Sequence, residues 1–204
     1  EELTEELSEE YWVAEMAVPV AEELFDPFFK EMPDRVNDFL MKGDERQTQQ
    51  VIRRLFQGFK NRPFPTREKI VDCCRRLLES LKFGYQHYFA RLITDPMLIA
   101  FSDEKDPKML REIAFILHHM ATHLIQFGEY ASSTKILQNL YSRHQKLLVN
   151  RDSEAQRLAK ILDRKLEVKT QKLLVNDLKS NEMTRQENAV RLLGSLGQLT
   201  TPLL

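Results

Sequence analysis

The chain has 204 residues, of which 42% are hydrophobic and 30% are charged, so it holds enough apolar side chains for a sizeable core. Glycine and proline occur only 6 and 8 times, and the helix formers Leu, Lys, Glu, Arg and Gln are abundant. This composition argues against a β-sandwich or barrel, which needs alternating runs, and against an α/β fold, which needs β-branched runs between helices. We therefore predict an all-α fold.

Residues 1–32 are predicted to form an acidic lead-in that caps one end of the core with its aromatic side chains. Six of the first ten residues are Glu. Residues 11–32 are apolar but interrupted by Pro19 and Pro27, so one or two short helices are expected there. Residues 1–50 carry 15 acidic and 4 basic side chains, a net charge of −11, which leaves +10 on the remainder of the chain.

From residue 33 onward, apolar side chains recur with the period of an α-helix. Pro33 suits the first turn of a helix, and Gly43 and Gly128 are natural stops. The predicted helices cover residues 33–42, 45–60, 66–81, 83–101, 107–127, 130–149, 153–166, 170–179 and 187–197.

Several polar or proline-containing segments are expected to interrupt these helices. Residues 61–65 contain two prolines and are predicted to form a loop, after which Thr66 caps the next helix. A break is expected near Pro96, and polar turns are expected at residues 103–106 and 182–186. Each helix has an apolar stripe that must be buried against a neighbour. Stacked antiparallel hairpins and a compact bundle would both achieve this, and periodicity alone does not separate them.

The end of the chain carries a family resemblance. An amphipathic stretch beginning at Thr170 is followed by a polar turn and then by a helix that ends in Leu193-Gly194-Ser195-Leu196-Gly197. This pattern, residues 170–204, resembles a HEAT repeat, although Asn181-Glu182 replaces the usual Asp-Pro turn. The resemblance implies that small residues at Ala189 and Gly194 let the paired helices approach closely and that Gly197 is the C-cap. Residues 202–204 look like the start of another repeat, so the chain is expected to be part of a longer protein.

A weaker resemblance lies upstream. The stretch from residue 124 to 140 has a Gly128-Glu129-Tyr130 turn followed by Ala131 and an Ile-Leu pair, which is similar to tetratricopeptide-type repeats. We interpret residues 33–169 as divergent helical hairpins and residues 170–204 as a HEAT-like repeat that the end of the chain cuts short. The expected architecture is therefore an α-solenoid of stacked antiparallel hairpins.

Metal binding and catalysis find little support in the sequence. His119 and His123 are spaced by four residues, which can place two imidazoles on one helix face for a metal ion. Zinc proteases need Glu next to the first His, but Met120 stands there. No nucleophile elbow and no phosphate-binding glycine loop occur. We expect no enzyme activity and no cofactor. A metal-binding or enzymatic site at His119 and His123 is kept as the second alternative to the function proposed at the end of this section.

The cysteines and the absence of long apolar runs in the sequence indicate the cellular compartment. Cys73 and Cys74 are adjacent, so on a helix their side chains point about 100° apart, and they are expected to be buried thiols of a reducing compartment. No apolar run has the length of a membrane span and no secretory signal occurs in the sequence. We therefore expect a cytoplasmic protein that does not bind membranes.

A cluster of basic residues is the main candidate for binding. Only Glu68 and Asp72 oppose eight basic side chains between residues 53 and 76. These are Arg53, Arg54, Lys60, Arg62, Arg67, Lys69, Arg75 and Arg76. Such a ridge is expected to be solvated, to meet an acidic protein partner, or to meet nucleic acid phosphates. The interleaved phenylalanines are expected to belong to the core.

The expected function is a protein-protein interaction scaffold or docking segment, because stacked hairpins form an extended surface with little closed pocket. The first alternative is a nucleic-acid-binding HEAT-like module that uses the ridge. The sequence pI of 6.6 favours the protein partner, since dedicated nucleic-acid modules usually have a pI above about 9.

Overall fold

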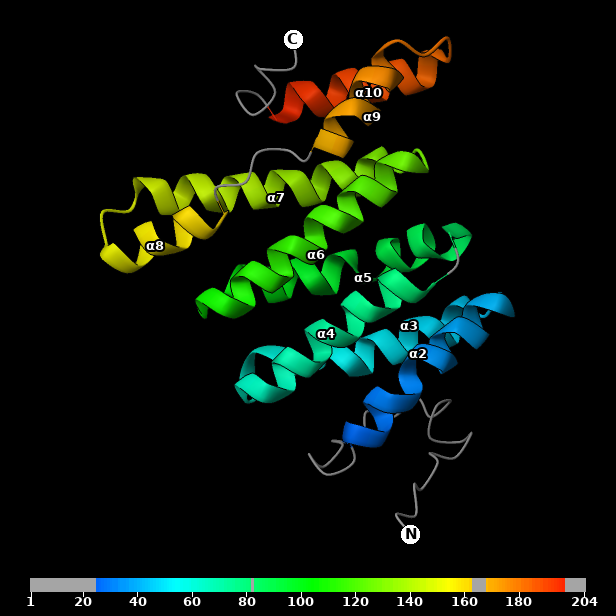
Figure 1. Ribbon diagram of the computed structural model, residues 1–204, viewed down its shortest axis with the longest axis vertical. Helices are drawn as coiled ribbons and strands as arrows, with labels where there is room; N and C mark the ends of the chain where they lie inside the picture. Colours follow the sequence, from blue (N-terminus) through cyan, green and yellow to red (C-terminus); the bar gives the residue numbers. More distant parts are fainter. Residues whose placement is uncertain (1–24, 82, 163–167, 197–204) are drawn as a thin grey trace. The chain divides into compact units, whose positions relative to one another are not determined.

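A computed structural model of the chain describes residues 25–81, 83–162 and 168–196 (Figure 1). Within these ranges it has nine α-helices, one short 3₁₀ helix and no strand, which confirms the all-α prediction. The chain divides into two units, residues 1–86 and 87–204, and each is described by itself. Most of the predicted acidic lead-in, residues 1–24, lies outside the described residues.

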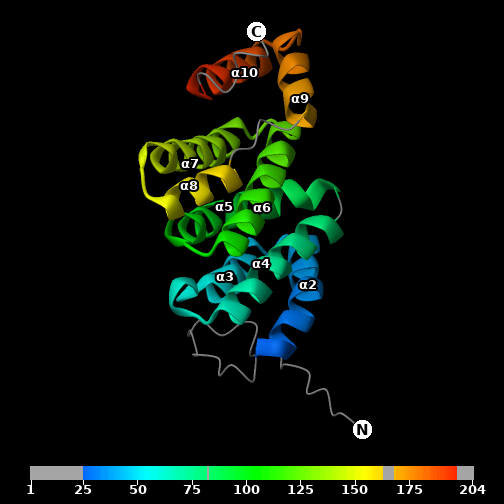
Figure 2. The ribbon, with the colours of Figure 1, turned by 60° about the vertical axis from the view of Figure 1, so that its left-hand side comes forward.

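The first unit is built around helix α2, which contacts both α3 and α4 (Figure 2). Its elements are α2 (Phe25–Met41), α3 (Glu45–Phe56), the 3₁₀ helix η2 (Phe59–Asn61) and α4 (Phe64–Ser80). Apolar side chains at helical spacing on each of these three α-helices are withdrawn from solvent. The fully buried ones include Met32, Val36, Val51, Leu55, Ile70, Cys73, Cys74 and Leu77.

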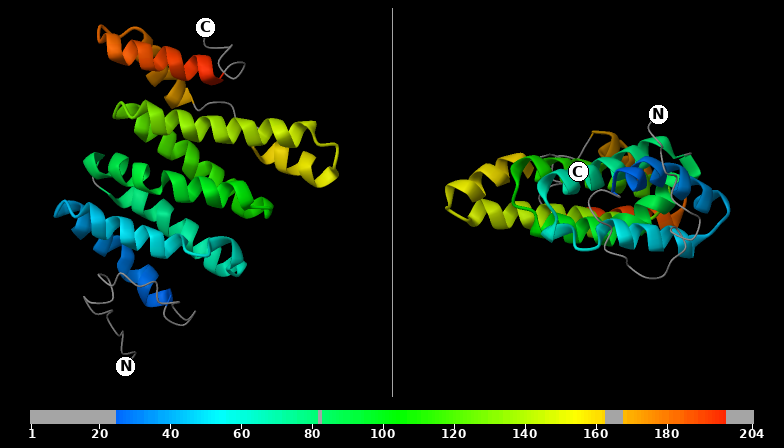
Figure 3. Two further views of the ribbon diagram at one scale, coloured as in Figure 1. Left: turned by 180° about the vertical axis from the view of Figure 1, so that it is seen from behind. Right: turned by 90° about the horizontal axis from the view of Figure 1, so that it is seen from below.

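The second unit is built around helix α6, which contacts α7, α8 and α9. Its elements are α5 (Phe83–Asp103), which begins in the last residues of the first unit, α6 (Pro107–Gln126), α7 (Tyr130–Val149), α8 (Ser153–Leu162), α9 (Val168–Leu178) and α10 (Met183–Leu196). Twelve of the 20 residues of α6 are buried, which accounts for its central position. Helix α10 packs on α7 and α9 (Figure 3). No described helix has the length and apolarity needed to cross a membrane.

Two of the tight turns between helices are built around a glycine in the same way. The φ angles of Gly43 and Gly128 are +70° and +78°, a left-handed conformation that glycine adopts without strain. Each glycine N–H bonds to the carbonyl three residues earlier, and the N–H of the next residue bonds to the carbonyl five residues before it. The predicted helix ends at both glycines are confirmed.

Three other turns share a glutamine as the fourth residue of the following helix, in α5, α8 and α10. In each turn the glutamine Nε2 donates to the main-chain carbonyl of a leucine eight residues earlier, in the last turn of the preceding helix. The pairs are Gln86 to Leu78 at 2.8 Å, Gln156 to Leu148 at 3.1 Å and Gln186 to Leu178 at 3.1 Å. The bond satisfies a carbonyl that a helix end leaves without an intrahelical partner.

Two prolines that were predicted to open or break helices lie inside them. Helix α2 runs through Pro33, and α5 runs through Pro96. An internal proline costs roughly 3 kcal/mol. Along α5, Ile93, Met97 and Phe101 form a continuous stripe with exposed fractions of 0, 0 and 2%. Burying three such side chains contributes more than the proline costs, at about 1.5 to 3 kcal/mol each, so the helix continues.

Other helix ends also differ from the prediction. Helix α3 ends at Phe56 rather than at residue 60, because Gly58 takes a left-handed φ of +65° and starts η2. Helix α4 begins at Phe64 and holds Pro65 in its first turn, where the missing N–H has no partner to lose, so Thr66 is not the cap. The predicted polar turn after residue 182 is instead the first turn of α10, which begins at Met183.

The two small residues that were expected to lie at a helix contact of α10 have different surroundings. Ala189 is completely buried, as expected for a small residue at a helix contact. Gly194 is exposed, and a Cβ atom built on it would meet no described atom within 4 Å, so this glycine does not permit a close approach to the described helices. Gly197 and residues 198–204, with the proposed C-cap and the start of a further repeat, lie outside the described residues.

Candidate interaction surfaces

The predicted basic ridge comes from α3, the loop with η2, and α4, all in the first unit. Arg53 and Arg54 occupy the last turn of α3, where the helix dipole favours positive charge. Lys60 lies in η2 and Arg62 follows it. Arg53, Lys60, Lys69 and Arg76 are exposed, whereas Arg54, Arg62, Arg67 and Arg75 are half-buried. All eight therefore reach the surface at least in part.

Acidic side chains on α4 neutralise one end of this ridge. The two carboxylate oxygens of Asp72 bind separate guanidinium groups, with Arg75 Nη2 at 2.5 Å and Arg76 Nε at 2.9 Å. Arg75 also lies 3.4 Å from Glu79, and the hydrogen bond to Asp72 raises the pKa of Arg75 above its ordinary value. The predicted ridge therefore does not continue as unpaired charge along α4.

The remaining positive charge is concentrated in residues 46–67, which we name the basic segment. It contains six basic side chains and no acidic one, because Glu45 precedes it and Glu68 follows it. Within the described residues, Arg53 and Lys60 form no ion pair. Both side chains are exposed, so their charge faces solvent and any ligand that approaches this end of the α3–α4 hairpin.

Local contacts hold the loop of the basic segment in place. The Nε of Arg62 donates to the carbonyl oxygen of Gln57 at 2.9 Å. The guanidinium of Arg67 lies 6.0 Å from the ring centre of Phe59 and 5.9 Å from that of Phe64, at the usual limit for a cation-π contact. Phe59 is only 7% exposed, so it belongs to the core, as predicted, and does not offer a stacking surface.

The two histidines of the metal-binding alternative, His119 and His123, meet on α6. His119 Nε2 and His123 Nε2 are 2.9 Å apart, and the rings are arranged edge to face with centroids 4.5 Å apart. A separation of 2.9 Å is a hydrogen bond, with one nitrogen as donor and the other as acceptor. Among the described residues, no group of three His, Cys, Asp or Glu side chains is placed to hold a metal ion. The pair forms a hydrogen-bonded contact within α6.

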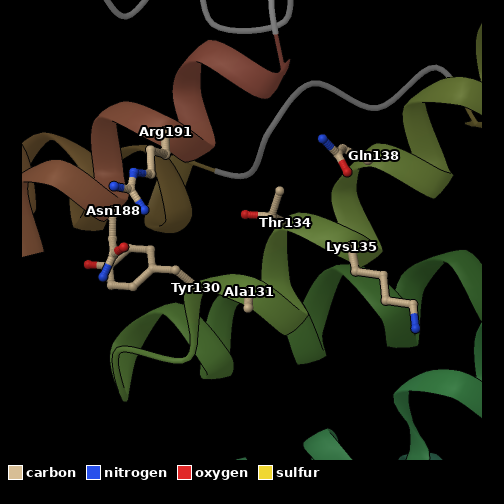
Figure 4. A pocket seen from close by; sticks show the side chains of 7 residues that line it. All are labelled: Tyr130, Ala131, Thr134, Lys135, Gln138, Asn188 and Arg191. Atoms are coloured by element: carbon tan, nitrogen blue, oxygen red, sulfur yellow. The ribbon is translucent and has the colours of Figure 1, made fainter.

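A second candidate surface, which the sequence did not indicate, is a cleft of about 290 Å³ between α7 and α10 (Figure 4). Its walls are Tyr130, Ala131, Thr134, Lys135, Gln138, Asn188 and Arg191. Tyr130, Thr134 and Gln138 follow one another at intervals of four on α7, and Asn188 and Arg191 are three apart on α10, so each set shares one helix face. None of the seven is acidic.

The two cations of this cleft differ in what they bind. Lys135 Nζ lies 2.6 Å from Asp95 Oδ1 and points away from the other cleft side chains (Figure 4). The Arg191 side chain instead extends over the cleft beside Asn188, and it has no hydrogen bond or ion pair with any described residue (Figure 4). Among the residues that the structure describes, the cleft therefore presents one unpaired positive charge beside uncharged polar groups.

One side of the cleft is braced by a buried hydrogen bond. Tyr130, only 6% exposed, donates its hydroxyl to Asp177 Oδ2 on α9 at 2.5 Å. Burial and then this hydrogen bond raise the pKa of Tyr130 well above its ordinary value, so the hydroxyl stays a donor. Arg185 Nη1 on α10 lies 3.7 Å from Asp177 Oδ1. These contacts connect α7, α9 and α10 and thereby fix the spacing of the cleft walls.

The four-residue spacing of Tyr130, Thr134 and Gln138 on α7 can be seen in the sequence. That Asn188 and Arg191 of α10 line the same cleft follows only from the packing of the two helices. No protein-family model matches the chain, and comparisons with curated proteins and with solved structures likewise found no match.

Proposed function

We propose that the chain is a cytoplasmic docking segment of a HEAT-like α-solenoid and that it binds an acidic segment of another protein through the basic segment. The observation that carries the proposal is the run of six basic and no acidic side chains in residues 46–67, with Arg53 and Lys60 exposed and unpaired among the described residues. Complementary charge steers association and suppresses wrong partners.

The ion pairs of α4 favour a protein partner over a nucleic acid. Asp72 binds both Arg75 and Arg76, so the unpaired charge that the described residues show, on Arg53 and Lys60, lies at one end of the hairpin. A nucleic acid gains affinity by neutralising a phosphate with each cation along a track. A short acidic stretch of protein needs only a few cations. The buried ring of Phe59 also removes one of the surfaces on which bases would stack.

Recurring turns support the solenoid part of the proposal. The glycine turns at Gly43 and Gly128 have the same two hydrogen bonds, and the glutamine turn occurs three times. Repeat proteins reuse one supersecondary unit whose neighbours bury its apolar face. The free thiols of Cys73 and Cys74 are consistent with a reducing compartment, which supports the cytoplasmic placement.

The binding test compares two variants that remove the same number of charges. One is Arg53→Gln with Lys60→Gln, and the matched control is Arg75→Gln with Arg76→Gln. The probe is a fluorescein-labelled peptide of alternating Glu and Ser, measured by anisotropy at several salt concentrations. We expect the first variant to weaken binding about tenfold, on the order of 1.4 kcal/mol, and the control to change it by less than about twofold, because Asp72 already holds both arginines.

Equal losses in the two variants would show that net charge alone attracts the peptide and would overturn the proposed surface. A short duplex DNA in the same assay serves as the competing ligand. If it binds more tightly than the peptide, with a steep salt dependence that the Arg53/Lys60 variant removes, the nucleic-acid alternative replaces the protein partner.

The architecture has a separate test by small-angle X-ray scattering. A compact domain of this length has a radius of gyration of about 17 Å. An α-solenoid gives a larger value and an asymmetric distance distribution, whereas a value near the compact limit would contradict it.

A further inference from the structure

The cleft between α7 and α10 collects polar side chains that form no hydrogen bond within the described part of the chain. Thr134 and Gln138 on α7, and Asn188 and Arg191 on α10, make no side-chain hydrogen bond with any described residue. The Thr134 hydroxyl points toward the side of the cleft that holds Asn188 and Arg191 (Figure 4). Side chains on two helices thus face one space with donors and acceptors still available.

The positive charge of Arg191 in the cleft favours an anionic ligand. Arg191 brings a planar guanidinium with five donors, which matches a carboxylate in a paired geometry. Lys135 is occupied by Asp95, and Asp177 is turned to Tyr130 and Arg185, so neither adds charge to the open space. We propose that this cleft binds a single carboxylate side chain within an otherwise uncharged, extended segment of a partner protein.

The size and the polar lining of the cleft are consistent with this occupant. Its volume of about 290 Å³ lies just below the usual range of small-molecule pockets, which begins at about 300 Å³. Asn188 lies next to Arg191, and Gln138 lies at the other side of the cleft, beyond Thr134 (Figure 4). The amide group of each can donate to and accept from a peptide backbone. One unpaired cation is too little for a polyanion such as a nucleic acid.

This inference concerns the second unit and goes beyond the proposed function, which rests on the basic segment. The two are separable because the probes differ. A peptide with one Glu offers little to six basic side chains, and the Arg53→Gln with Lys60→Gln variant is expected to bind it as well as the unaltered chain does.

The test is an NMR titration of the full chain, labelled with nitrogen-15, with an acetylated and amidated Gly-Ser-Glu-Ser-Gly peptide. We expect amide shifts concentrated at residues 134, 138, 188 and 191. Arg191→Gln is expected to weaken binding about tenfold or more, because it removes a charge-assisted hydrogen bond. Arg191→Lys keeps the charge but loses the paired geometry, and is also expected to weaken it.

The matched control is Arg157→Gln, which removes an exposed arginine of α8 in the same unit that has no ion pair with a described residue. It is expected to leave the titration unchanged. A Gln-for-Glu peptide that binds equally well, or an Arg191→Gln variant that retains full affinity, overturns the proposal. Tighter binding of a phosphoserine peptide in place of the Glu peptide overturns the choice of a carboxylate ligand.

Discussion

Replacing Tyr130 by Phe isolates the buried hydrogen bond that connects α7 to α9. The hydroxyl donates to Asp177 Oδ2 at 2.5 Å, and both side chains are buried, with exposed fractions of 6 and 8%. Phenylalanine keeps the ring and its packing but removes the donor. Asp177 then retains Arg185 at 3.7 Å, a weaker contact because the arginine side chain is 48% exposed.

The magnitude follows from the charge and burial of the acceptor. A hydrogen bond to a charged group contributes about 1.5 to 3 kcal/mol, and a buried acceptor that loses its donor also keeps its desolvation cost. A partly exposed ion pair contributes at most about 1 kcal/mol, so Arg185 does not compensate fully. We expect a loss of about 2 kcal/mol, which corresponds to a fall in Tm of about 4 to 8 °C for a chain of this size.

Thermal unfolding followed by circular dichroism measures this loss. The control is Tyr141→Phe on the same helix, since the half-buried Tyr141 has no hydrogen bond with a described residue. We expect the control to shift Tm by less than about 2 °C. If both variants shift Tm equally, the Tyr130 hydroxyl has no special role and the account of the α7–α9 contact is wrong.

Further predictions concern the buried thiols, two glycines and one glutamine turn. Burial raises the pKa of Cys73 from 9.0 to about 12 and that of Cys74 well above 9.0, so neither thiol should react with a thiol reagent until the chain unfolds. Because the unfolded thiols ionise first, the free energy of unfolding should fall as pH rises above 9.0, and urea titrations at increasing pH measure this. Gly128→Ala should lower Tm, because the φ of Gly128 is +78°, a conformation that alanine adopts only with strain. Gly194→Ala should raise Tm and stabilise the chain by about 0.5 to 1 kcal/mol, since a Cβ added to this helical glycine meets no described atom within 4 Å. Gln156→Ala should destabilise by about 0.5 to 1.5 kcal/mol in urea unfolding, through loss of its bonds to two turn carbonyls, and an unchanged midpoint would remove the glutamine turn as a stabilising device.

Local chemistry determines which features the sequence predicts. The glycine stops were predictable because a left-handed residue is needed to end the helix in one tight turn. The predictions of a helix start at Pro33 and a helix break near Pro96 are wrong. The sequence rule that proline ends or opens a helix considers only local backbone geometry, whereas the burial that outweighs it depends on neighbouring helices. Hydrophobic periodicity therefore located most of the helices, and most of the errors lie at helix ends.

Of the two candidate surfaces, the sequence predicts local features of the basic ridge but not the α7–α10 cleft. The pairing of Asp72 with Arg75 and Arg76 follows from spacings of three and four on one helix, so the sequence already contained it. Arg75 also pairs with Glu79, which lies three residues beyond the end of the predicted ridge. Counting charges only between residues 53 and 76 therefore missed an acidic side chain that pairs with the ridge. The α7–α10 cleft was not predictable, because no periodicity within α7 identifies which helix packs opposite to it.

The turns at both ends of α7 help to hold this helix in place. Its first residue follows the Gly128 turn, and its last turn is bonded by Gln156 of the next helix. Its buried side chains, among them Ile136 and Leu137, supply the contacts to neighbouring helices. Position and orientation of the helix are therefore fixed without Thr134 or Gln138, which make no bond within the described chain. The backbone of α7 is held in place without these two side chains, so the proposed ligand would have to order side chains but not the helix that carries them.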